Sequence, residues 1–167
     1  APAITTSTVL SRAQEWVDAD LHYCQSAYDA VDGDPGCWAW EGASHRCHRK
    51  DVAAWNAYRS DCSGFVSWAW ELPAPGRVTS TFAPFEMDIT NVIDAIDLVP
   101  GDAVNNDEHI MLFKEWTTPG VEATFMEEPG CSSSEPYARA FTANVTIDAT
   151  SAAGRALLAL ADQIAGS

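Results

Sequence analysis

The sequence predicts one domain of the α+β class, with helices in its first half and strands in its second half. Its 167 residues, 47% of them hydrophobic, suit a single unit with one substantial core. Apolar residues recur at helical intervals early in the chain, whereas later apolar runs are short and separated by turn signals such as Pro-Gly. No internal repeat or low-complexity tract divides the sequence. We therefore expect one domain over residues 1–167.

The first half is predicted to hold two main helices separated by an irregular insert. Apolar side chains share one face from about Ser7 to Tyr23, which indicates an amphipathic helix. Residues 29–50 are rich in Gly, Pro and polar residues and are interpreted as an irregular insert, and residues 51–58 as a short helix. A further helix should begin after Asp61, whose side chain suits an N-cap, and should end before Pro73.

The second half is predicted to form a sheet and a closing helix. A strand should begin at Ala103, directly after a Pro-Gly-Asp turn. Residues 109–116 and 121–128 indicate two strands around a tight connection, and residues 143–148 another strand. Residues 151–164 carry apolar side chains at one-face helical spacing, which predicts a helix.

The charge of the chain excludes some classes of partner. Its net charge is −15, from 24 acidic and 9 basic residues. Nucleic acid phosphates and anionic membrane surfaces both need Lys and Arg, so we expect neither as a partner. No apolar run reaches the length of about 18 residues that a membrane-spanning helix requires.

Five cysteines are present: Cys24, Cys37, Cys47, Cys62 and Cys131. An odd number leaves one thiol without a partner inside the molecule, and Cys62 is the natural candidate because its surroundings suit a reactive group. The other four allow three pairings, among which we favour Cys37–Cys47 and Cys24–Cys131.

The stretch SDCSGFVSWAW, from Ser60 to Trp70, places Cys62 in the first turn of a predicted helix. The unpaired amide groups and the dipole at that end favour a thiolate. Ser63 and Gly64 keep the turn slim, so a substrate carbonyl can approach and the same amides can stabilise an oxyanion. On this pattern alone, a buried cysteine acting as a small hydrophobic residue fits equally well.

A thiolate nucleophile needs a base, usually histidine, and a polar group that orients the imidazole. His109 opens a predicted strand, where its ring can face a cleft while Ile110 turns to the core. Glu127 and Glu128, at the end of the next strand, are both candidates for the orienting group. Neighbouring residues of a strand face opposite sides, so the register decides between them. A surface histidine and two solvated acids would produce the same pattern.

Taken together, YRSDCSGFVSWAWELP, LVPGDAV and HIMLF resemble the NlpC-type family of papain-like cysteine peptidases, which cut bacterial cell-wall peptides. The upstream stretch VDADLHYCQSAYD is similar to a secreted actinobacterial branch of that family. The resemblance covers residues 16–28 and 58–128. It implies a papain-like fold of the NlpC form, with the nucleophile helix packed on a central antiparallel sheet.

The resemblance also implies roles for individual residues. Cys62 would be the nucleophile, His109 the base and Glu127 the orienting group, while Tyr23 and Ser63 would help to bind the oxyanion or the substrate. The implied reaction is hydrolysis of an amide bond in peptidoglycan stem peptides by a secreted monomer, without metal or cofactor. Many family members have His, Asn or Gln as the third residue, so a carboxylate here should hold the protonated imidazole more firmly.

Other hypotheses stay open at this point. The same scaffold could serve a secreted binding domain that has lost turnover, and the same residues could serve an amidase, acyltransferase or toxin. The insert contains Cys37, His45, Cys47 and His48, which are all zinc-ligand types. Ligands adjacent in sequence share one tetrahedron with difficulty, so we expect a disulfide-closed loop there rather than a zinc site.

Overall fold

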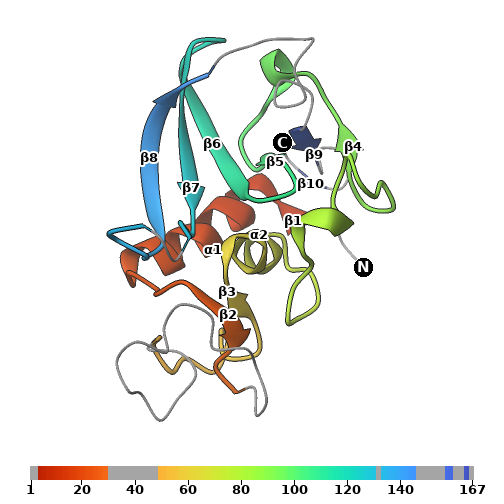
Figure 1. Cartoon of the computed structure of the whole chain (residues 1–167). Helices are drawn as coiled ribbons and strands as arrows, with labels where there is room; N and C mark the ends of the chain where they lie inside the picture. Colours follow the sequence, from red (N-terminus) through yellow and green to blue (C-terminus); the bar gives the residue numbers. More distant parts are fainter. Residues whose placement is uncertain (1–3, 30–48, 131–132, 146–156, 160–163, 166–167) are drawn as a thin grey trace.

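The computed structural model covers the whole chain and describes residues 4–29, 49–130, 133–145, 157–159 and 164–165 (Figure 1). The helices are α1 (Thr6–Asp18) and α2 (Cys62–Ala69), with the short 3-10 helices η2 (Thr79–Thr81) and η3 (Ala95–Asp97). The strands are β1 (Ile4–Thr5), β2 (Cys24–Ala27), β3 (Arg59–Ser60), β4 (Asn91–Val92), β5 (Ala103–Asn105), β6 (Ile110–Thr118), β7 (Glu122–Glu127), β8 (Arg139–Asn144), β9 (Leu157–Ala159) and β10 (Ile164–Ala165).

The main sheet has six strands in the order β4-β9-β5-β6-β7-β8, and every neighbouring pair in it is antiparallel. A separate antiparallel pair, β2 and β3, lies on the other side of α2 from β6–β8 (Figure 1). The predicted combination of helices with an antiparallel sheet is confirmed. No helix in the described part of the chain is long and apolar enough to cross a membrane.

The first helix ends earlier than the sequence predicted. It begins after the N-cap Thr5, whose hydroxyl accepts a hydrogen bond from Thr8 N at 3.1 Å. The amide of Leu21 bonds to the carbonyl of Trp16 and that of Asp20 to the carbonyl of Val17, both at 3.1 Å. Asp20 adopts a φ of 48°, so the helix closes in a Schellman arrangement with an aspartate at the left-handed position. The apolar spacing continued beyond this stop signal, which explains the over-long prediction.

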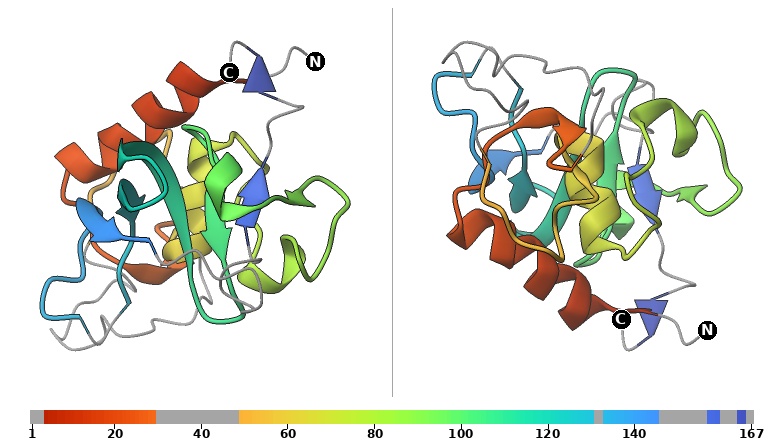
Figure 2. Two further views of the ribbon diagram at one scale, coloured as in Figure 1. Left: turned by 90° about the horizontal axis from the view of Figure 1, so that it is seen from above. Right: turned by 90° about the horizontal axis from the view of Figure 1, so that it is seen from below.

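The start of the second helix is predicted correctly, but the helix ends at Ala69, before the predicted end at Leu72. Asp61 caps it by accepting a hydrogen bond from Gly64 N at 2.8 Å, and Pro73 follows its last turn. All eight of its residues are buried. The helix contacts α1, β3, β6 and β7, and α1 runs beside it along the edge of the molecule (Figure 2). A helix enclosed on all sides must be apolar all round, which the sequence FVSWAW nearly satisfies.

The core lies in two parts. The larger packs α1 and α2 against β6 and includes Trp16 stacked on Trp68, with ring centres 5.7 Å apart, together with Phe65 and Leu112. The smaller is built around Phe113 and Phe125, which face away from α2. Near the start of β6, even-numbered residues such as Leu112 therefore belong to the larger core, and odd-numbered ones such as Phe113 belong to the smaller core.

One prediction in the connecting segments is wrong and another is displaced along the chain. Residues 51–58 contain turns at 53–57 instead of a helix, because Asn56 bonds through its side chain to Val52 N at 3.0 Å and to Asp51 Oδ1 at 2.7 Å. Such side-chain bonds compete with helical ones. The strand predicted at 143–148 is found as β8, which begins at Arg139, and residues 146–148 lie outside the described residues.

The predicted closing helix is also wrong where the structure describes it. Within residues 151–164, Leu157–Ala159 form β9, which fills the main sheet between β4 and β5, and Ile164 begins β10. Sheet pairing with distant strands overrides the local helical spacing. The rest of that range lies outside the described residues, as do residues 30–48 of the predicted insert.

Gly64 allows the first turn of α2 to touch β3. A Cβ atom at this position would lie 2.0 Å from the carbonyl oxygen of Arg59 and 2.7 Å from Asp61 Oδ1. We expect Gly64→Ala to lower the free energy of unfolding by about 1–3 kcal/mol, because backbone must move to admit the methyl group. Gly130→Ala is the matched control, since nothing lies within 4 Å of its added Cβ. Equal urea midpoints for the two variants would contradict this packing.

Asp102, in the Pro-Gly-Asp turn before β5, should make stability depend on pH. Its Oδ2 accepts a hydrogen bond from Val99 N at 2.9 Å, while its Oδ1 has no partner among the described residues. Burial raises the pKa of Asp102 to about 6, against the opposing effect of the Val99 hydrogen bond. An unfolded aspartate ionises near pH 3.9, so the folded chain binds an extra proton between about pH 4 and pH 6. The resulting stability is complete below that window and is lost as the pH rises through it.

Asp102→Asn keeps an oxygen for Val99 and cannot ionise. Its Tm should therefore fall less than that of the parent protein between about pH 4.5 and pH 7. Asp97→Asn, at an exposed position of the same connection, is the control. If all three proteins lose the same number of degrees, the carboxyl of Asp102 is not the group responsible.

Candidate active site

Cys62 is the first residue of α2 and is buried. Of the two cysteines in the described part of the chain, it is the one with a free thiol. The amide groups of Cys62 and Ser63 belong to the first turn, where no helical carbonyl lies four residues earlier. They are therefore positioned to interact with negative charge near the sulfur atom.

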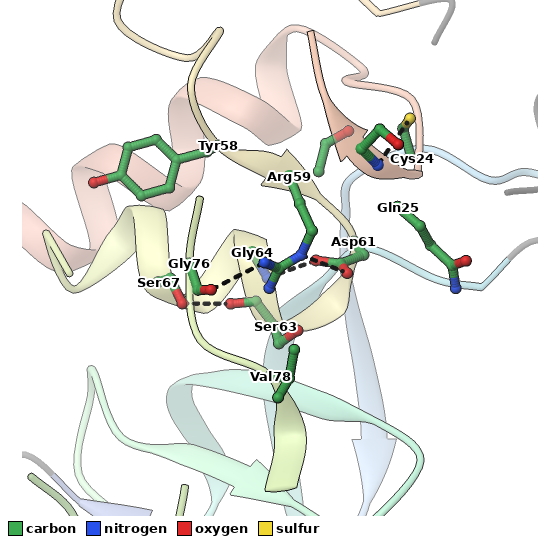
Figure 3. Close-up of polar contacts among 12 residues, drawn as sticks. Cys24, Gln25, Tyr58, Arg59, Asp61, Ser63, Gly64, Ser67, Gly76 and Val78 are labelled. Atoms are coloured by element: carbon green, nitrogen blue, oxygen red, sulfur yellow. Dashed lines mark hydrogen bonds and ion pairs between the residues drawn. The ribbon is translucent and has the colours of Figure 1, made fainter. Parts of the chain in front are cut away.

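The capping carboxylate of Asp61 is neutralised by a cation. Arg59 Nε lies 3.1 Å from Asp61 Oδ2, and the rest of its guanidinium donates to the carbonyl oxygens of Gly76 at 2.9 Å and Arg77 at 2.6 Å (Figure 3). These three bonds fix the position of the guanidinium. The acid that caps the helix therefore adds little net repulsion to a thiolate at Cys62.

His109 immediately precedes β6 and is held by a turn. Its backbone amide donates to Asn106 Oδ1 at 2.8 Å, and its carbonyl accepts from Asn106 N at 3.0 Å. The side chain is 31% exposed. One side of the ring therefore stays open to solvent while the other faces the protein.

The register of β6 and β7 places Glu127 next to this ring. Leu112 pairs with Met126, so odd-numbered residues near the ends of both strands share one face. On that face His109 Nε2 lies 2.7 Å from Glu127 Oε1. Glu128 turns to the opposite face and does not contact His109. Of the two candidate glutamates, Glu127 is therefore the one placed to orient the imidazole.

The imidazole of His109 also interacts with the side chain of Cys62. Since Nε2 is bound to Glu127, Nδ1 is the ring nitrogen left for the sulfur. Burial by itself would lower the pKa of His109, but the hydrogen bonds to Cys62 and Glu127 and the charges of both groups raise it to about 9. The ring is therefore protonated at neutral pH, which suits an imidazolium beside a thiolate.

Glu127 is shared between two cations. Arg139 Nη2 lies 2.6 Å and Nε 2.8 Å from Glu127 Oε2. Burial would raise the pKa of Glu127, but the hydrogen bonds from His109 and Arg139 hold it below its ordinary value. Arg139 is not among the predicted site residues, because the predicted strand at residues 143–148 begins after it, whereas β8 begins at Arg139 itself.

Glu128 has the opposite character from its neighbour. It is fully buried, and neither of its oxygens has a hydrogen-bond partner in the described part of the chain. Burial raises its pKa well above the ordinary value, although the charge of Arg49 opposes the shift. The pKa shifts of these adjacent glutamates thus have opposite directions: the charged form is favoured beside His109 and the neutral form is favoured in the core.

Tyr23 lies close enough to Cys62 for their charges to interact. Burial raises the pKa of Tyr23 to about 12; the hydrogen bond from Gln25, at 3.3 Å, opposes this shift, while nearby negative charges such as that of Cys62 add to it. Its hydroxyl is therefore a neutral donor. Ser63 is buried, and its carbonyl oxygen accepts a hydrogen bond from the Ser67 hydroxyl at 2.8 Å (Figure 3).

Two hollows border these residues. The smaller, of about 80 Å³, lies beside His109 and is lined also by Val104, Asn105, Asn106 and Met111. The larger, of about 450 Å³, lies beside Arg139 and is lined also by Asp20, Glu135, Tyr137 and Ala138. The larger hollow has the volume of a small-ligand pocket and the smaller one does not, and Cys62 lines neither of them.

The predicted disulfides stay predictions. Both Cys37 and Cys47 lie outside the described residues, and so does Cys131, the expected partner of Cys24. The histidines of the alternative zinc site lie in the same undescribed segment. Among the residues that are described, no group of three or more His, Cys, Asp or Glu side chains could hold a metal ion.

The interaction between Cys62 and His109 predicts that the thiol reacts with an alkylating agent already at pH 6–7. With His109 protonated up to about pH 9, the parent protein should react rapidly with iodoacetamide at pH 6–7. His109→Ala should slow this reaction at pH 6–7 at least about tenfold, because the positive charge next to the sulfur atom is lost. Alkylation at Cys62 is located by mass spectrometry, with circular dichroism to check that the variant folds. Equal rates at pH 6–7 would show that the imidazole does not activate the sulfur.

Comparisons with known proteins give little further information. No family model matches the chain, and no curated protein matches it. Among solved structures, it is similar to the P60 domain of an antigen from M. avium subspecies paratuberculosis, with 13% sequence identity and a TM-score of 0.46. The match covers 92% of this chain and 91% of that one. A likeness at this level does not assign the chain to a family.

Proposed function

We propose that this protein is a papain-like cysteine peptidase of the NlpC type that hydrolyses an amide bond in peptidoglycan stem peptides. The observation that carries the proposal is the series Cys62–His109–Glu127, in which His109 interacts with Cys62 and hydrogen-bonds to Glu127, with a free thiol at a capped helix N-terminus. The substrate class rests on the sequence motifs that resemble the NlpC-type family. The same motifs support an extracellular location.

In the acylation half of the reaction, the Cys62 thiolate attacks the carbonyl carbon of the scissile amide. The negative charge that develops on the carbonyl oxygen is stabilised by the amide of Cys62 and the neutral hydroxyl of Tyr23. When the intermediate collapses, the carbon–nitrogen bond breaks and His109 gives its Nδ1 proton to the departing amine. A thioester on Cys62 and a neutral His109 remain.

In the second half, water attacks the thioester while His109 takes a proton from it through Nδ1. The carbon–sulfur bond then breaks, releasing a carboxylic acid and restoring the thiolate and the imidazolium. Glu127 accepts a hydrogen bond from Nε2–H throughout, so the ring keeps one orientation and its positive charge is compensated. No metal or organic cofactor takes part in this scheme.

The neighbouring glutamates provide a matched test of the proposal. On purified peptidoglycan, Cys62→Ala should abolish the release of peptides. Glu127→Gln should lower kcat about 10- to 100-fold, because a neutral amide replaces one charge-assisted hydrogen bond to His109. Glu128→Gln makes the same chemical change one residue later, where burial favours the neutral acid, and should stay within about threefold of the parent enzyme. Release is measured by chromatography of the soluble products.

The products of the same digestion separate the remaining hypotheses. Mass spectrometry of the fragments identifies the cut bond, and cleavage at the sugar–peptide linkage would make the protein an amidase. A parent protein that binds walls but releases nothing would be a binding domain. An active Cys62→Ala variant, or equal losses in the two glutamine variants, would overturn the assignment of these residues.

A further inference from the structure

Arg139 directs two of its N–H groups to one oxygen of Glu127, while the other oxygen bonds to His109. Its Nη2 and Nε lie 2.6 Å and 2.8 Å from Oε2, whereas Oε1 lies 2.7 Å from His109 Nε2. Each carboxylate oxygen therefore has its own cationic partner. A carboxylate held in this way cannot rotate about its terminal bond without losing hydrogen bonds on both sides.

The fold presents Arg139 to Glu127 directly. The two residues are opposite one another in the pairing of β7 with β8. The guanidinium carbon also lies 4.7 Å from the centre of the Phe141 ring, on the same strand. With 48% of its side chain exposed against 5% for Glu127, Arg139 forms the outer end of the series that runs inward to Cys62.

The neighbouring residue shows what happens to a buried acid at this end of the sheet without such a partner. Glu128 has no hydrogen-bond donor in the described part of the chain, and burial favours its neutral form. Glu127 is also nearly buried, yet the bonds from His109 and Arg139 favour its charged form. Arg139 bonds to Oε2 of Glu127 and His109 to Oε1, so Glu127 is the group that links Arg139 to the imidazole.

We propose that Arg139 is a positioning residue, which holds Glu127 charged and aimed at His109 and thereby maintains the imidazolium–thiolate pair. This inference rests on the proposed function, because it assigns that pair a catalytic purpose. It adds a fourth member to the series, supplied by a strand that the sequence motifs do not include. Arg139 need not touch the substrate to have this effect.

The test measures the rate at which iodoacetamide modifies Cys62 between pH 5 and pH 9, which requires no substrate. Arg139→Gln should slow the reaction at pH 6–7 about three- to tenfold, since Glu127 loses a charge-assisted partner. Arg139→Lys keeps the charge with fewer donors and should recover part of that loss. Arg77→Gln is the control, because Arg77 forms a similar two-donor pair with Asp88, at 2.8 Å and 2.6 Å, on the exposed surface. Its pH profile should match that of the parent.

A double variant distinguishes a route through Glu127 from any other. If Arg139 acts through Glu127, then Arg139→Gln should have no further effect on a protein that already carries Glu127→Gln. A further slowing in the double variant would overturn the inference, and so would an unchanged profile for Arg139→Gln alongside a slowed Glu127→Gln protein. The latter result would leave the proposed peptidase intact. If Glu127→Gln and His109→Ala also matched the parent, the proposed function itself would fail.

Discussion

The register between β6 and β7 is the constraint on which the chemistry of this site depends. With Leu112 opposite Met126, the side chains of His109 and Glu127 share one face of the sheet, and Glu128 is directed into the core. A shift by one residue would exchange the two glutamates and turn the apolar residues of both strands the wrong way. The cores on the two faces, around Leu112 on one side and Phe113 on the other, therefore fix the choice of acid. The packing of many apolar residues thus fixes the register, and the register places Glu127 beside His109.

Local cations decide the charge state of acids in a chain whose net charge is −15. Arg59 neutralises the capping acid at the N-terminus of α2, and Arg139 keeps Glu127 ionised. With only 9 basic residues available, two of them lie within this small region. The acidic surface thus coexists with a site where Asp61 and Glu127 each have a cationic partner and burial favours the neutral form of Glu128.

Local sequence signals predicted much of the site, but they did not predict which distant strands pair with one another or in which register. The N-cap at Asp61, the helix behind Cys62 and the strand after His109 are each encoded within a few neighbouring residues, and the structure agrees with all three. The choice of Glu127 over Glu128 depends on register, which a single strand does not reveal. Arg139 was missed because its strand has little alternation, and β9 was taken for a helix because its pairing partners are distant in sequence. The end of α1 was also missed, since an aspartate occupies a position where glycine is the usual signal.

Because Arg139 is half-exposed, dissolved ions can weaken its ion pair with Glu127. Dissolved ions screen a charge at the surface within about 10 Å at 0.1 M ionic strength, but they screen buried charges much less. Glu127 is nearly buried, and His109 is less exposed than Arg139, whose guanidinium is in contact with water. Ionic strength should therefore act on the outer link and leave the inner one nearly unchanged. The protein would then sense the salt content of its surroundings through the group farthest from its sulfur atom.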